Sequence, residues 1–271
     1  MDQARRIFWI RDLDSKTVLL TGASTGLGPY IARRLRAEGA GITLSARNQA
    51  ALDELARELG NARVIAADLN QRSDLERLAQ EAGAVDVLVS NAGIPASGPL
   101  TSFSLDQIDN AISVNLRAGI MLARLLVPAM VERGAGHIVF MASMSGHLPA
   151  PKNSLYNAGK FGLRGFAQAL RMELRGAGVG VSLVSPTYVS EAGMWAEGGG
   201  RAPAIFQVTP VDVADAVVKA IKGNRLEVMV AKLPVRAAAR LQGLAPVVGE
   251  SILSRAVEHG DEVVERQRVK R

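Results

Sequence analysis

A tyrosine and a lysine stand four residues apart in the segment Tyr156-Asn157-Ala158-Gly159-Lys160. In a helix this spacing places both side chains on one face. A free phenol has a pKa near ~10, too high for efficient proton exchange at neutral pH. Lowering that pKa to about 7–8 requires roughly 3–4 kcal/mol from nearby positive charge, which Lys160 can supply in part. Tyr156 could thus act as a general acid and base that Lys160 tunes, but such a pair taken alone is common by chance, and surface packing is the preferred alternative until a further residue supports the chemistry.

A serine that could complete this chemistry lies thirteen residues before Tyr156. Ser143 follows the strand-like segment Ile138–Met141, and ligands meet an open α/β sheet at the ends of its parallel strands. Its hydroxyl can donate a hydrogen bond to a carbonyl oxygen that becomes an alkoxide as a hydride arrives. Ser145 is the nearest alternative. The three residues together predict the interconversion of a carbonyl and an alcohol.

The hydride would come from a dinucleotide, for which the chain has a candidate site. The segment TGASTGLG, residues 21–28, lies between a strand-like and a helix-like stretch. Glycines allow such a turn to approach a pyrophosphate closely, and the N–H groups of the following helix point at the phosphates. A glycine turn without a ligand is the alternative. The residues expected to contact the coenzyme here are Gly22, Ser24, Thr25, Gly26, Leu27 and Gly28.

The end of the second strand indicates which dinucleotide is bound. NAD-binding sites commonly place an acidic residue there to accept the ribose 2′-hydroxyl. Here the stretch reads Leu44-Ser45-Ala46-Arg47-Asn48, with one arginine and no acid. An arginine suits a 2′-phosphate, so we expect NADP(H) to be preferred, with NAD(H) possible. The alternative is that Arg47 is an ordinary solvated cation.

Strand-like and helix-like segments alternate along most of the chain. Short apolar strands separated by amphipathic helices indicate a parallel sheet covered on both faces. We predict an α/β fold of the Rossmann type, a three-layer doubly wound sheet of about seven strands. The strands are expected at 16–20, 42–44, 64–66, 85–89, 137–140, 180–184 and 227–230, and the helices at 29–38, 50–59, 72–82, 105–132 and 155–177, with a further helix opened by Thr209-Pro210.

Composition limits the alternatives. The chain has 271 residues with a formal net charge of +6, no cysteine and three histidines without ligand-like spacing. A disulfide scaffold, a thiolate zinc site and a cysteine nucleophile are excluded, and no metal is expected. Basic residues are spread along the chain, so we expect no nucleic-acid partner. We expect one domain, 1–271, with an N-terminal extension (1–15), a substrate flap (190–206) and a C-terminal helical extension (234–271).

The chain shows no secretory signal and no run of ~18 uninterrupted apolar residues, so we expect a cytoplasmic protein without a transmembrane segment. Its amphipathic ends, around Ile7-Phe8-Trp9 and within 235–257, could contact a membrane surface. The preferred alternative is that both ends pack on the core or on another subunit.

With these motifs identified, the chain resembles the short-chain dehydrogenase/reductase family, in its single-domain branch with TGxxxGxG and YxxxK motifs. The resemblance covers residues 16–230 in order. It rests on TGASTGLG, Asp68-Leu69 after the third strand, Asn91-Ala92-Gly93 after the fourth, Asn115 in the long fourth helix, Ser143, YNAGK and Pro186.

The resemblance implies a role for each matching position. Tyr156 would be the general acid/base, Lys160 would also bind the nicotinamide ribose, Ser143 would hold the substrate oxygen, and Asn115 would keep a proton-relay water near the lysine. The family also implies a homodimer or homotetramer. Further coenzyme contacts would come from Asp68 and Leu69 beside the adenine, from Asn91, Ala92 and Gly93, and from Pro186 and Val189.

Two positions depart from the family pattern. The usual Pro-Gly after the sixth strand is Pro186-Thr187, and the usual threonine four residues on is Glu191, preceded by Ser190. Val189 can still donate through its backbone. These changes affect the detailed nicotinamide contacts and the flap rather than the hydride chemistry.

The leading hypothesis is an NAD(P)-dependent oxidoreductase (CH–OH donors) that acts on a lipophilic ketone or aldehyde such as a steroid, retinoid, acyl chain or aromatic ketone. Two alternatives remain open: a non-catalytic dinucleotide sensor, and a nucleotide-sugar epimerase or dehydratase. The chain keeps all four polar catalytic residues, and its TGxxxGxG spacing and short C-terminal region disfavour the epimerase. The apolar substrate face is expected from Ile94, Leu148, Met194, Trp195 and Phe206.

Overall fold

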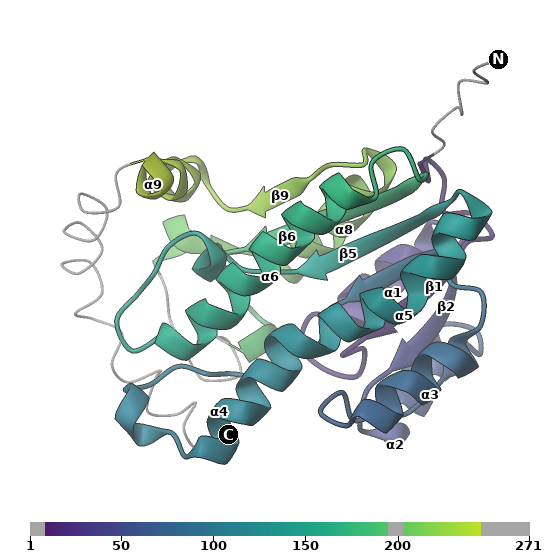
Figure 1. Ribbon diagram of the computed structural model, residues 1–271, viewed down its shortest axis with the longest axis horizontal. Helices are drawn as coiled ribbons and strands as arrows, with labels where there is room; N and C mark the ends of the chain where they lie inside the picture. Colours follow the sequence, from purple (N-terminus) through teal and green to yellow (C-terminus); the bar gives the residue numbers. More distant parts are fainter. Residues whose placement is uncertain (1–8, 195–202, 245–271) are drawn as a thin grey trace.

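The computed structural model describes residues 9–194 and 203–244. Seven parallel strands form one twisted sheet in the order β3-β2-β1-β4-β5-β6-β9 (Figure 1). The predicted doubly wound Rossmann-type fold is confirmed. The strands are β1 (Thr17–Thr21), β2 (Gly41–Ser45), β3 (Arg63–Val64), β4 (Val87–Ser90), β5 (Gly136–Met141), β6 (Val179–Pro186) and β9 (Glu227–Val230).

The order of the strands reverses beside β1, which pairs with β2 on one side and β4 on the other. Crossovers from β1 and from β4 leave in opposite directions, so the helices that follow these two strands, α1 and α5, cover opposite faces of the sheet. The carboxyl ends of β1 and β4 therefore border the crevice where open α/β sheets bind ligands. The fold places the glycine turn and the Asn91-Ala92-Gly93 segment at this point.

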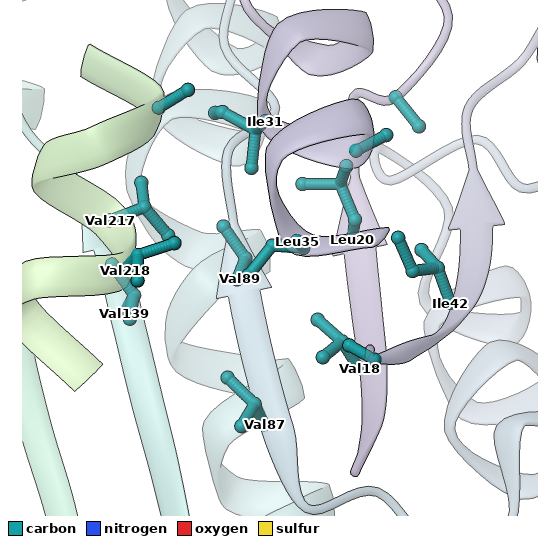
Figure 2. Packing of buried hydrophobic residues seen from close by; sticks show 14 of the residues in the cluster. Val18, Leu20, Ile31, Leu35, Ile42, Val87, Val89, Val139, Val217 and Val218 are labelled. Atoms are coloured by element: carbon teal, nitrogen blue, oxygen red, sulfur yellow. The ribbon is translucent and has the colours of Figure 1, made fainter. Parts of the chain in front are cut away.

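One face of the sheet is covered by α1 (Gly28–Ala37), α2 (Gln49–Glu58) and α8 (Pro210–Lys222). Leu35 on α1 and Val217 on α8 are fully buried against strand residues such as Leu20 and Val89 (Figure 2). Helix α8 begins at the predicted Thr209-Pro210, with proline at its first position, and Thr209 forms a capping box with Asp212.

The opposite face is covered by α3 (Arg72–Ala82), α5 (Ala118–Arg133) and α6 (Ser154–Glu173). Phe140 on β5 is fully buried and meets Phe166 on α6 edge to face, with ring centroids 5.8 Å apart. Such aromatic pairs add about 0.5–1.5 kcal/mol beyond their buried area. This contact fixes α6, which carries Tyr156 and Lys160, against the sheet.

The long fourth helix contains an irregularity that the sequence did not predict. The stretch expected as one helix over 105–132 consists of α4 (Leu105–Ile112), a π-helical turn at Ser113–Arg117 and α5. By length and composition Leu105–Arg133 could cross a membrane, a criterion that core helices of soluble proteins also meet. Here Leu122 and Met130 are fully buried in the core.

The predicted extensions are described only in part. Ile10 and Leu13 pack into the core, which favours core packing over membrane contact for this part of the N-terminal extension. On either side of the predicted flap, β7 (Tyr188–Val189) pairs with β8 (Gln207–Val208), and within the flap a short helix spans Ala204–Phe206. Helix α9 (Leu233–Leu244) begins the C-terminal extension. Residues 1–8, 195–202 and 245–271 lie outside the described part of the chain.

His137, at the start of β5, is fully buried. Ser182 donates its hydroxyl to a backbone carbonyl, at 2.6 Å from that of Arg225, so its oxygen is free to accept from Nε2 of His137 at 2.8 Å. Nδ1 has no hydrogen-bond partner. Burial and the charge of Arg171 lower the pKa of His137 to about 3. The folded chain therefore holds a neutral imidazole well below the pH at which an unfolded chain protonates it.

This difference makes the fold acid-sensitive. His137 binds a proton below pH ~6.5 in the unfolded state but only near pH ~3 in the folded state. The free energy of unfolding therefore decreases as the pH is lowered from ~6.5 to ~3. At about pH 4.5 the loss from this one group is about 2–3 kcal/mol relative to neutral pH. His137→Gln keeps an N–H donor near the Nε2 position but cannot take up this proton. Its free energy of unfolding, from denaturant curves at the two pH values, should therefore decrease by about 2–3 kcal/mol less than that of the unsubstituted protein. An equal pH dependence in both proteins would contradict the assignment.

Candidate active site

The glycine turn after β1 is built around two residues in the left-handed region, Gly22 (φ 63°) and Gly26 (φ 60°). A Cβ on Gly22 would lie 2.7 Å from Cα of Ala92, and one on Gly28 would lie 2.2 Å from the carbonyl oxygen of Gly22. No other residue type fits either position. The turn thus brings the loops after β1 and β4 into direct contact.

The first helix begins without a side-chain cap. Its N-cap residue, Leu27, makes no side-chain capping bond, and Pro29 occupies the first turn. An uncapped helix N-terminus beside a glycine turn is an anion-binding arrangement. The predicted residues Ser24 and Thr25 lie in this turn, and Thr25 is exposed. These features fit the diphosphate of a dinucleotide.

Thr21 and Asn91 connect the two sides of the crevice. Oγ1 of Thr21 accepts from the backbone N–H of Asn91 at 3.2 Å and of Ala92 at 3.3 Å. Nδ2 of Asn91 donates to the carbonyl oxygens of Thr21 and Gly22, at 3.1 and 3.0 Å. The predicted residues Asn91 and Ala92 thus also hold the turn in place. Thr21 was not singled out from the sequence, since its hydroxyl acts on backbone atoms seventy residues away.

The residues predicted to contact the adenosine part of the coenzyme follow the ends of β2 and β3. Arg47 is exposed just beyond β2, and the adjacent Asn48 caps α2. The hydroxyl of Ser45 is buried without a partner. Asp68 accepts a hydrogen bond from the N–H of Asn70, and Leu69 is buried beside it. The carboxylate of Asp68 therefore already shapes its own loop.

Lys160 is buried and anchored to the sheet. Its Nζ donates to the carbonyl oxygen of Met141, at the end of β5, at 2.9 Å, and lies 5.5 Å from the ring centroid of Tyr156. Burial lowers the pKa of Lys160 to about 8. The i, i+4 geometry expected from the sequence is present. Met141 acts through a backbone atom, which no side-chain pattern could reveal.

Tyr156 keeps a high pKa in the chain without coenzyme. Burial raises its pKa to about 12, and a hydrogen bond with Ser143 opposes that shift only in part. With Lys160 in place, the pKa of the phenol still lies above its ordinary value. The chain without coenzyme holds a protonated hydroxyl that is hydrogen-bonded to Ser143. Such a group can donate a proton to a substrate oxygen.

Asn115 lies at the centre of the π-helical turn and is buried. Its Oδ1 accepts from the N–H of Ile94 at 2.9 Å, and its Nδ2 donates to the carbonyl oxygen of Ile94 at 3.0 Å. A Cβ on Gly93 would lie 3.1 Å from this Oδ1 and 3.8 Å from Nζ of Lys160. Gly93 therefore leaves room beside the amine, and π-helical turns are frequent at functional sites.

Only some of the residues predicted to bind the substrate lie together at the site. Ile94 adjoins Asn115, and the terminal methyl of Met194 would lie 3.4 Å from a Cβ on Gly93, so both border the site. Leu148 packs instead with Met144 and α9. Phe206 is exposed, and Trp195 lies outside the described residues.

Two residues predicted to contact the coenzyme lie at and after the end of β6. Pro186 ends β6, and Val189 is buried in β7. Glu191 takes a positive φ of 60° and is exposed. Within residues 9–194 and 203–244, no cluster of histidine and acidic side chains is placed to hold a metal ion.

Comparisons with known proteins identify the family. The family model described as short chain dehydrogenase matches residues 16–199. "Ketoacyl reductase HetN" from Nostoc sp. is 44% identical over 232 residues, covering 82% of this chain and 81% of that protein. "Dehydrogenase/reductase SDR family member 7B" from Danio rerio is 31% identical, covering 88% and 84%.

Solved structures are similar as well. A metagenomic short-chain oxidoreductase in complex with NADP has a TM-score of 0.70 at 32% identity, covering 82% of this chain and 98% of that one. A short-chain dehydrogenase from Sphingobium yanoikuyae in complex with NADPH has a TM-score of 0.75 at 30% identity, covering 88% and 95%.

The chain belongs to the short-chain dehydrogenase/reductase family. It is an NAD(P)-dependent oxidoreductase that acts on a small-molecule substrate.

Proposed function

We propose that the protein reduces a ketone on an apolar acyl chain with NADPH, using Tyr156 as the proton donor. The observation that carries this proposal is the hydrogen-bonded pair of Ser143 and Tyr156 beside a buried lysine, at the carboxyl end of β5. The printed name of the Nostoc relative supports the ketoacyl substrate. Met194 and Ile94 offer apolar surface beside the site.

Two hydroxyl groups handle the substrate oxygen. Ser143 donates a hydrogen bond to it, and Tyr156 gives it a proton. The bound coenzyme supplies the hydride and, once oxidised, a positive charge near the phenol. The carbonyl carbon thus gains the hydride, and the electron pair of its π bond moves to oxygen and takes the Tyr156 proton. The products are an alcohol and the Tyr156 phenolate. The positive charges of Lys160 and of the oxidised coenzyme would stabilise this phenolate.

Lys160 and Asn115 return a proton to the phenolate. Nζ of Lys160 has further donors beyond its bond to Met141, and Gly93 leaves space beside it. We assign to Asn115, in the π-helical turn, the holding of a water that links the amine to solvent. The same residues serve the reverse reaction, in which Tyr156 accepts the alcohol proton.

NADPH preference is assigned to Arg47. Its exposed guanidinium lies just beyond β2 with no acidic residue in the stretch from Leu44 to Asn48. A carboxylate there would repel a 2′-phosphate, whereas a guanidinium can form a two-point hydrogen bond to it. Relatives solved with NADP and NADPH support this preference.

We also propose that the protein is a homodimer or homotetramer. Exposed apolar side chains lie on α5 (Leu125 and Val131) and α6 (Phe161 and Met172). Burying apolar surface of this kind between copies is favourable at about 25 cal/mol per Å².

Replacing the proposed acid tests the mechanism. Tyr156→Phe removes only the hydroxyl, so NADPH-dependent reduction of a 3-oxoacyl thioester should fall by about 10²–10⁴-fold in kcat, the usual contribution of a general acid. The coenzyme Kd, measured by fluorescence titration, should stay nearly unchanged. Tyr30→Phe, which removes a phenol from α1, is the matched control and should keep full activity. Unchanged turnover in Tyr156→Phe would remove this residue from the mechanism.

The coenzyme assignment has its own test. Arg47→Leu should weaken NADPH binding about 10–100-fold, the loss expected for a hydrogen bond to a charged group, and leave NADH binding unchanged. Arg57→Leu, an exposed arginine on the adjoining α2, should alter neither. Tighter binding of NADH than of NADPH by the unsubstituted protein would refute the preference.

A further inference from the structure

The loop that carries Ser143 is held by polar groups on two sides. On the helix side, Nδ2 of Asn157 donates to the carbonyl oxygens of Ser145, at 2.5 Å, and Leu148, at 3.1 Å. Its Oδ1 accepts from the N–H of Ala150 at 3.3 Å. Asn157 follows Tyr156 directly, so the loop is attached to the turn of α6 that presents the phenol.

On the sheet side the loop is attached through a buried histidine. Nε2 of His147 lies 2.6 Å from Oε1 of Glu227, the first residue of β9. The side chains are 4% and 10% exposed. Ser185 on β6 donates to the same oxygen at 2.7 Å, and Nε of Arg164 on α6 lies 3.4 Å from the other. Four elements meet at this carboxylate.

The carboxylate is ionised at neutral pH. Burial favours the neutral acid, but hydrogen bonds from His147 and Ser185 and the nearby charges outweigh it, so the pKa of Glu227 lies below its usual value. An ionised carboxylate only accepts hydrogen bonds, so His147 must present a proton on Nε2. The contact is then a donor–acceptor bond with a defined direction, and it fixes the ring of His147.

This bond is transmitted to Ser143 over a short path. His147 donates its backbone N–H to the carbonyl oxygen of Met144, and Gly146 donates to that of Ser143, at 2.9 and 2.8 Å. The hydroxyl oxygen of Ser143 in turn accepts from the N–H of Ser145 at 3.1 Å. A Cβ on Gly146 would lie 2.9 Å from the carbonyl oxygen of Lys160, so the loop cannot shift toward α6.

We propose that Glu227 is a positioning residue for the reaction: through His147 it holds the 143–150 loop so that Ser143 stays in register with Tyr156. The carboxylate of Glu227 contacts His147, Ser185 and Arg164, so its effect on Ser143 is indirect. The proposal rests on the proposed function, because it assigns Ser143 a part in catalysis. A misplacement of about 1 Å in such a site can cost about 10²-fold in rate.

A double-mutant cycle with Ser143 tests the proposal. Glu227→Leu should lower kcat for a 3-oxoacyl thioester about 10–100-fold and leave the NADPH Kd unchanged. In the Ser143→Ala background the same substitution should lower kcat less than about 3-fold, because the hydroxyl that Glu227 positions is absent. Glu227→Gln, which keeps an oxygen for His147 and Ser185, should restore most of the activity. Glu132→Gln, at an exposed position on α5, is the control and should change neither value.

The outcomes separate the two proposals. Equal losses in both backgrounds mean that Glu227 acts on overall stability, which overturns the positioning role. Full activity in Ser143→Ala, or no carbonyl reduction by the unsubstituted protein, overturns the proposed function, and the positioning role falls with it. If Glu227→Leu does not bind coenzyme because it fails to fold, His147→Phe, which removes the donor and keeps a ring, enters the same cycle with the same expected dependence on Ser143.

Discussion

The chemistry of this site depends on the pKa of the Tyr156 phenol, which burial raises and nearby positive charge lowers. Desolvation raises the pKa of Tyr156 to about 12 and lowers that of Lys160 to about 8, so the same dry environment acts on both groups. The hydroxyl therefore keeps its proton until a further positive charge arrives. A phenol in this state is protonated at neutral pH and can donate its proton to a substrate oxygen.

The rest of the fold serves to keep that phenol at the coenzyme crevice. The edge-to-face contact of Phe140 and Phe166 fixes α6 on the sheet, and Lys160 ties the same helix to the end of β5. The glycine turn lies against Ala92 closely enough that a single methyl group would separate the two loops. Backbone proximity, rather than side-chain chemistry, thus forms the part of the site that would hold the diphosphate.

The sequence predicts the fold well because its strands are short, apolar and regularly separated by amphipathic helices. It also identifies Ser143, Tyr156 and Lys160, whose spacing carries a chemical meaning. It does not predict the π-helical turn at Asn115, since Ser113–Arg117 has no residue that forbids an α-helix. Nor does it predict the contact of His147 with Glu227, eighty residues apart, because register between distant elements decides it. The high pKa of Tyr156 in the free chain is not predictable from the sequence either, because burial, which causes it, has no local sequence signal.

The most direct measurement is the ionisation of Tyr156 in the free and coenzyme-bound protein. The chain has three tyrosines, so the difference in tyrosinate absorbance between the unsubstituted protein and Tyr156→Phe isolates this one. Titrated alone, the protein should show a Tyr156 pKa of about 12. With saturating NADP⁺ the pKa should fall by several units, because each unit requires only about 1.4 kcal/mol of interaction with the new positive charge. The same high pKa in both titrations would contradict the account.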